Sequence, residues 1–115
     1  MKISEAAKIL EGKFMCLEEL KDREVTSACG SDMMSDVLAF AKDQAVLITG
    51  LCNPQVIRTA EMMDMRCIIF VRGKVPTEEM IALAVEREIV LISTPRRMFS
   101  ACGKLYSAGL QSGGF

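Results

Sequence analysis

The residues best suited to chemistry lie in three short turns, each of which directly follows an apolar run. The turns carry hydroxyl, amide, glycine and cationic residues: Thr49, Gly50 and Asn53; Arg72, Gly73 and Lys74; and Ser93 and Thr94. Glycine lets a ligand approach the backbone closely, and helix N-termini combined with cations attract anions such as phosphate. The three turns therefore predict a binding site for a small anionic metabolite or a nucleotide.

The same residues also have a purely structural interpretation. Asn53 and Thr94 each precede a proline, and this pairing is typical of a helix cap followed by the first helical turn. Cations in exposed turns are usually solvated and need no ligand. The sequence leaves both interpretations open.

The chain lacks the signatures of nucleotide-binding enzymes. It has no G-x-G-x-x-G motif, and neither Gly73-Lys74 nor Gly103-Lys104 has the glycine five positions earlier that a P-loop requires. It also has no histidine, and most of its carboxylates fall on predicted outer helix faces. We therefore predict a protein that is not an enzyme and uses no cofactor.

The five cysteines predict no metal site, because they contain no C-x-x-C pair. Cys67 and Cys102 fall on predicted buried faces, where a free thiol behaves as a small hydrophobic group. Cys52 differs, because it lies between a strand and a helix start, where the helix N-terminus lowers a thiol pKa. An enzyme or redox accessory protein that uses Cys52 is therefore the alternative function.

Three apolar runs must position these turns. Residues 45–48, 67–71 and 89–92 read as strands buried on both faces, and helical patterns capped by Asn53, Thr77 and Thr94 follow them. Parallel strands deliver their C-terminal turns to one edge of a sheet. The predicted fold is therefore α/β: a small layered domain with a mainly parallel sheet flanked by helices.

The N-terminal half is expected to add shorter elements around this core. Ser4 is the predicted cap of a helix that Gly12 ends, and Ser31 or Asp32 is the predicted cap of a helix over 33–42. The remaining predictions are strands at 1–3, 14–16 and 25–29, a solvated segment at 18–24, and a flexible tail at 110–115.

Composition limits the class of protein further. The 115 residues suit one domain, 1–115, and a net charge of -1 does not indicate a nucleic-acid partner. The apolar stretches are too short to cross a membrane and the N-terminus carries charges, so we expect a cytoplasmic protein without a signal peptide. Apolar residues beyond the needs of a three-strand core predict a homodimer: Phe14, Met15, Met33, Met34 and Phe40.

Four segments resemble the DRTGG domain family over about Leu10 to Leu110: AVLITG, NPQVIRTAEMM, IIFVRGKVPTEEMIALA and VLISTP. The resemblance implies a small α/β regulatory module without catalytic activity, commonly associated with dimerisation. Such modules are fused to CBS-domain pyrophosphatases and phosphotransacetylases, and are related to the N-terminal domain of HPr kinase. The chain departs from the family where the Asp-Arg pair would fall, at Leu51 and Cys52. The Thr-Gly-Gly segment would fall on 71–73, where only Gly73 agrees.

Overall fold

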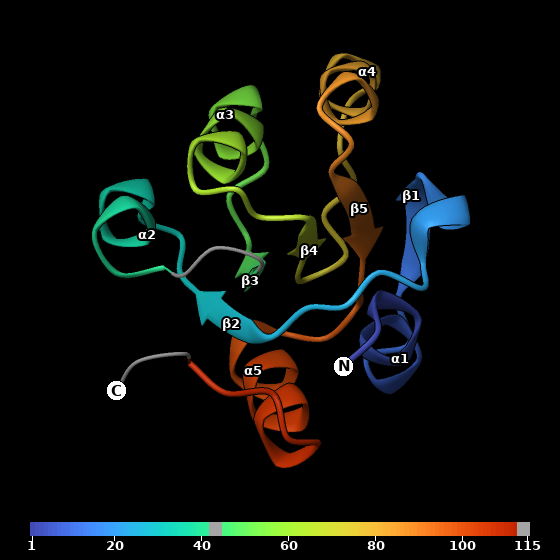
Figure 1. Ribbon diagram of the computed structural model, residues 1–115, viewed down its shortest axis with the longest axis vertical. Helices are drawn as coiled ribbons and strands as arrows, with labels where there is room; N and C mark the ends of the chain where they lie inside the picture. Colours follow the sequence, from blue (N-terminus) through green and yellow to red (C-terminus); the bar gives the residue numbers. More distant parts are fainter. Residues whose placement is uncertain (42–44, 113–115) are drawn as a thin grey trace.

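The computed structural model describes residues 1–41 and 45–112. Its strands form one five-stranded sheet in the order β1-β5-β4-β3-β2 (Figure 1). The strands are β1 (Lys13–Cys16), β2 (Ser27–Gly30), β3 (Ala45–Thr49), β4 (Cys67–Phe70) and β5 (Val90–Ser93). The helices are α1 (Ile3–Ile9), the short 3-10 helix η1 (Glu18–Leu20), α2 (Met34–Phe40), α3 (Pro54–Met62), α4 (Glu78–Glu86) and α5 (Met98–Ser107).

Four neighbouring strands, β2 to β5, run parallel, and β1 pairs with β5 in the antiparallel direction. The prediction that the three apolar runs form adjacent parallel strands is confirmed. Because each of these strands is joined to the next by a helix, β2, β3, β4 and β5 all end at the same edge of the sheet.

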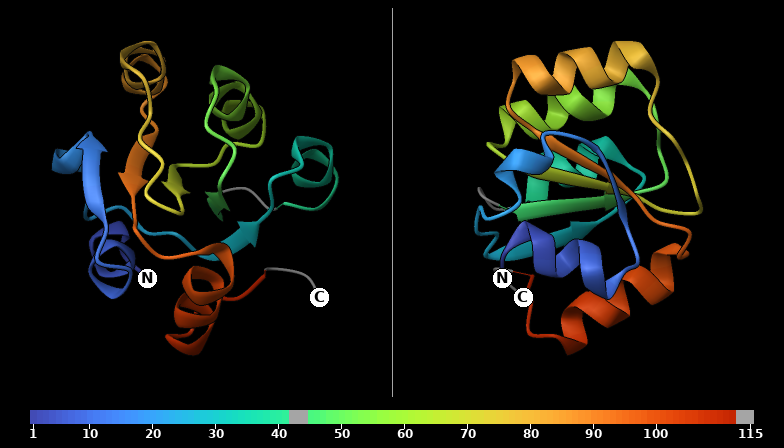
Figure 2. Two further views of the ribbon diagram at one scale, coloured as in Figure 1. Left: turned by 180° about the vertical axis from the view of Figure 1, so that it is seen from behind. Right: turned by 90° about the vertical axis from the view of Figure 1, so that its right-hand side faces the viewer.

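The sheet lies between two layers of helices, with α2, α3 and α4 on one face and α1 and α5 on the other (Figure 2). Side chains alternate between the two faces along each strand. Leu47, Ile68 and Leu91 pack with α2, α3 and α4. Ile48, Ile69 and Ile92 pack with α1 and α5. Both faces of the central strands are therefore buried, as their unbroken apolar runs predict.

The predicted edge strand at 1–3 is wrong, because Ile3 already begins α1 and Lys2, not Ser4, is its N-cap. Only a single antiparallel bridge, between Lys2 and Glu24, forms there. Ile3 shares the buried stripe of α1 with Ala6, Ala7 and Leu10, at helical spacing. Burying Ile3 on this stripe places the helix start before the residue that we predicted as its cap.

Two residues predicted as helix caps, Thr94 and Asp32, do not cap the helices that follow them, whereas two others do. Asn53 and Thr77 do cap α3 and α4, each accepting a hydrogen bond from the backbone three residues later. Thr94 does not cap α5, whose N-cap is Arg97. Asp32 does not cap α2 either, because α2 begins at Met34 after Met33. In both cases the side chain that we predicted as a cap bonds to another segment of the fold.

The first residues of the predicted flexible tail are held by the fold. Leu110 is only 4% exposed, and the carbonyl of Gln111 accepts a hydrogen bond from the backbone of Ala28 on β2. Residues 113–115 lie outside the described residues. Within 1–41 and 45–112, no helix combines the length and the apolar character that crossing a membrane requires.

Candidate anion-binding edge

The site predicted from the three turns lies at the edge where β3, β4 and β5 end. β3 leads to Gly50, β4 leads to Arg72, and β5 ends at Ser93. The turns are tied together by their backbones, because the N–H groups of Arg72 and Gly73 donate to the carbonyls of Arg96 and Thr94 at 2.8 and 2.9 Å. The turns after β4 and β5 are therefore held together by backbone hydrogen bonds.

Four of the predicted site residues use their side chains inside the protein. The Thr94 hydroxyl donates to the carbonyl of Leu10 at 2.6 Å, and the Ser93 hydroxyl donates to the carbonyl of Lys74 at 2.7 Å. The Asn53 side chain accepts from the backbone of the α3 first turn at 3.3 Å. Thr49 is buried and bonded as well. These residues hold the turns in shape, and the groups that face outward come from the turn after β4.

Arg72 and Gly73 form a tight turn in which both residues adopt the left-handed conformation, with φ of 59° and 69°. Glycine adopts this conformation readily, whereas arginine does so at a cost. The Arg72 guanidinium lies directly over Gly50, where a Cβ atom would come within 2.1 Å of a guanidinium nitrogen. The glycine predicted to admit a ligand thus admits an arginine side chain of the same protein.

Asp32 is the residue of this edge that the sequence interpretation missed. One carboxylate oxygen accepts from the backbone N–H of Gly50 at 2.6 Å and from the hydroxyl of Thr49 at 3.2 Å. The other oxygen lies 3.8 Å from the guanidinium of Arg72. Asp32 follows the strand predicted at 25–29. If that strand is parallel to the others, its turn lies at the same sheet edge, and this could have identified Asp32 as a site residue.

Lys74 supplies the second cation, and it is exposed next to Cys52. Ion pairs join Arg72 to Asp32 and Arg96 to Glu11, whereas no ion pair joins Lys74 to any described residue. The ammonium group of Lys74 is therefore available to an anion from solution.

Burial raises the pKa of the Cys52 thiol, and the charge of Lys74 only partly opposes that effect. The sequence predicts that the helix N-terminus lowers this pKa, but desolvation is the larger influence here. Within 1–41 and 45–112, no three residues among Cys, Asp and Glu are grouped as metal ligands.

A comparison with solved structures finds a fold likeness. The chain matches the crystal structure of the CBS and DRTGG domains of the regulatory region of Clostridium perfringens pyrophosphatase, which is complexed with its activator diadenosine tetraphosphate. The TM-score is 0.75 and the identity is 20%, over 90% of this chain and 45% of that chain. No protein-family model and no curated protein matches the sequence. The chain thus has a DRTGG-like fold, as its strand and turn motifs predict.

Proposed function

We propose that this chain is a cytoplasmic, non-catalytic regulatory module that binds a small phosphate-bearing metabolite or nucleotide at the strand-end edge and self-associates. The observation that carries the ligand site is the pair of cations after β4. Arg72 and Lys74 lie in one turn whose backbone is held by hydrogen bonds to the carbonyls of Arg96 and Thr94, so both cations project from the same part of the surface. Cations beside a helix N-terminus, here that of α3, favour an anion.

The solved regulatory region with this fold supports the proposal in part. That protein is complexed with a nucleotide activator that carries phosphates. This chain spans 45% of its length, so the likeness supports a regulatory role more directly than a particular ligand. The chemistry of the edge itself, two cations near a helix N-terminus, supports the phosphate group.

The alternative role for Cys52 receives no support from the site. A reactive cysteine needs a lowered thiol pKa, and burial raises that of Cys52. A regulatory module therefore fits the chemistry of the edge better than a thiol enzyme or a redox accessory protein does.

Thermal shift with a panel of nucleotides and phosphorylated metabolites tests the ligand site. A ligand that binds only the folded protein raises the melting temperature by mass action, and added salt should reduce this rise. Arg72→Ala and Lys74→Ala should each remove most of the rise. The matched controls Arg58→Ala and Lys104→Ala change exposed cations elsewhere on the protein and should keep it. If no compound shifts the melting temperature of the parent protein, the ligand site is wrong.

Self-association has a candidate surface that differs from the one predicted. Met34 is buried, and Phe14 and Met15 pack against the core, so of the four predicted interface residues whose side chains are described Met33 is the exposed one, at 60%. The side chain of Phe40 lies outside the described residues. Three of the predicted interface residues, Phe14, Met15 and Met34, therefore pack in the core of their own chain.

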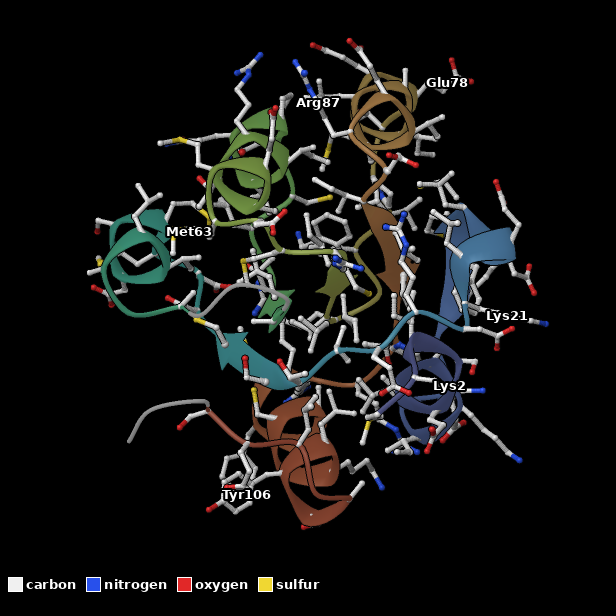
Figure 3. All side chains as sticks on the ribbon, in the orientation of Figure 1. Lys2, Lys21, Met63, Glu78, Arg87 and Tyr106 are labelled. Atoms are coloured by element: carbon white, nitrogen blue, oxygen red, sulfur yellow. The ribbon has the colours of Figure 1, made fainter. Side chains whose placement is uncertain are left out.

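The outer face of α5 carries the larger exposed aromatic groups. Phe99 is 91% exposed and Tyr106 is 64% exposed, and Figure 3 shows Tyr106 projecting to one side of α5. Gly103 lies between them, with open space where a Cβ atom would be. These residues border a shallow apolar hollow of about 680 Å³. Exposed aromatic side chains are typical of protein interfaces.

A second copy of this chain fits the α5 face because the face is complementary to itself. Phe99 and Tyr106 lie on opposite sides of Gly103, so two antiparallel α5 helices would place each aromatic ring against the other kind. No charged residue interrupts the stripe formed by Phe99, Gly103 and Tyr106. The antiparallel arrangement also sets Arg97, at the N-terminus of one helix, near the C-terminal carbonyls of the other, where a cation is favourable.

A further inference from the structure

The carboxylate of Asp32 receives the kinds of group that commonly bind an anion. A backbone N–H from Gly50 and a hydroxyl from Thr49 donate to one oxygen, and the Arg72 guanidinium lies near the other. Main-chain N–H groups and arginine are the usual ligands of phosphate in proteins. An internal anion therefore already occupies part of the donor set at this edge.

The contacts to Asp32 differ in strength. The hydrogen bond from Gly50 is short, at 2.6 Å, and anchors the carboxylate to the end of β3. The distance to Arg72 is 3.8 Å, and no hydrogen bond joins these two side chains. Ion pairs of this kind between exposed groups are weak. The contact between Asp32 and Arg72 is thus the one that another anion would replace.

The pair is open to solution. The side chain of Arg72 is 42% exposed and that of Asp32 is 51% exposed. The guanidinium is kept over Gly50 only because that residue lacks a Cβ. A rotation of the Arg72 side chain would release Asp32 without moving the backbone turn, which its own hydrogen bonds hold in place.

We infer that Asp32 competes with the ligand for Arg72, so that the edge accepts a phosphate dianion and rejects a simple carboxylate. This inference rests on the proposed function and adds to it the ligand class and a residue that sets selectivity. A phosphate makes two strong charge-assisted bonds with a guanidinium and outweighs the weak contact to Asp32. A monocarboxylate offers Arg72 no more than Asp32 already does, so it does not bind.

Asp32→Asn tests this competition, because asparagine keeps an oxygen for Gly50 and Thr49 while losing the charge. The probes are inorganic pyrophosphate and acetate, measured by calorimetry at low salt. We expect Asp32→Asn to bind pyrophosphate roughly two- to fivefold more tightly than the parent, and to gain measurable acetate binding. Adding Arg72→Ala should abolish both effects. Asp36→Asn, an exposed carboxylate on α2, is the matched control and should behave as the parent does.

A second variant guards against a folding defect in Asp32→Asn. Gly50→Ala leaves every charge in place but fills the position under the guanidinium, so Arg72 must leave Asp32. It should tighten pyrophosphate binding in the same direction. If the parent binds pyrophosphate and neither variant binds it more tightly, the competition is wrong while the proposed site stands. If neither the parent nor either variant binds pyrophosphate, the proposed site and the competition both fail.

Discussion

At the scale of single residues, Gly50 and Arg72 determine each other's positions. A Cβ on Gly50 would meet three atoms of the guanidinium at 2.1 to 2.7 Å, but these atoms are the far end of a flexible side chain. We therefore predict that Gly50→Ala lowers the free energy of unfolding by less than about 1 kcal/mol, the worth of an exposed ion pair. In an Arg72→Ala background the cost should vanish. Chemical denaturation measures both, and an equal cost in the two backgrounds would contradict the contact.

Cys52 is the second residue whose environment makes a prediction. Burial raises the pKa of its thiol, so the thiol stays protonated at neutral pH and the reactive thiolate forms only as the pH rises beyond the ordinary thiol range. Alkylation followed by mass spectrometry from pH 7 to 10 should show slow labelling of Cys52 at pH 7. The rate should rise steadily with pH.

Lys74 provides the control for this measurement, because its charge lowers the pKa of the Cys52 thiol. Lys74→Ala should raise that pKa further. It should therefore slow the labelling of Cys52 at every pH below the one at which the labelling rate levels off. Labelling of Cys102, whose thiol pKa is raised by burial, should not change. Rapid labelling of Cys52 alone at pH 7 would revive the redox alternative.

At the scale of elements, β4 lies at the centre of the sheet and its side chains fill both cores. Ile69 is fully buried between the sheet and the layer of α1 and α5. Ile69→Ala should lower the free energy of unfolding by about 2–5 kcal/mol, through lost burial and the cavity left behind. Val75→Ala, at a position that is 61% exposed, should change it by less than about 0.5 kcal/mol. A loss below about 1 kcal/mol for Ile69→Ala would contradict this central position.

The two motifs that pair a capping residue with proline show how far local pattern determines an element. Asn53-Pro54 starts α3 directly, whereas Thr94-Pro95 precedes a turn and α5 begins only at Met98. The Thr94 hydroxyl donates to the carbonyl of Leu10, 84 residues away in the chain, and accepts from the backbone of Arg96. The Thr94 side chain is thus used in a long-range contact, although its neighbours in sequence predict a helix cap.

At the scale of the whole molecule, the proposed dimer has a definite geometry. In an antiparallel pair of α5 helices, Phe99 lies opposite the partner's Tyr106, whereas the two copies of Phe99 are about 10 Å apart along the axis. A mixture of Phe99→Cys and Tyr106→Cys should therefore form a disulfide-linked dimer under mild oxidation, and each variant alone should form little. The parent protein controls for its own cysteines.

Sedimentation tests the same dimer without cross-linking. The single helix seam is small compared with stable interfaces, so we expect a dimer that dissociates as the protein is diluted through the micromolar range. Phe99→Ser should abolish it, and Met62→Ser, at an exposed apolar position on the opposite helix layer, should not. A single 12.6 kDa species at high micromolar concentration would rule the dimer out.

The parallel core of this protein follows from local sequence pattern. Runs such as 45–48 and 67–71 are apolar at every position, and only strands buried on both faces remove such side chains from water. Asn53 and Thr77 likewise predict the starts of their helices, because a capping side chain bonds to backbone within one helical turn. These features depend on neighbours in sequence. The order of strands and helices along the chain therefore follows from them, and with it the edge at which the parallel strands end.

The groups that meet at that edge depend instead on how distant segments pack together. Asp32 reads as a helix cap, yet it anchors to Gly50 because β2 lies beside β3 and both end there. Phe99 is apolar, yet it is exposed, because Ala101 and Leu105 already fill the contact of α5 with the sheet. The sequence could place Asp32 in a turn after a strand, but the partners of a side chain in distant segments are set by the packing of those segments, so these contacts appear only in the folded protein.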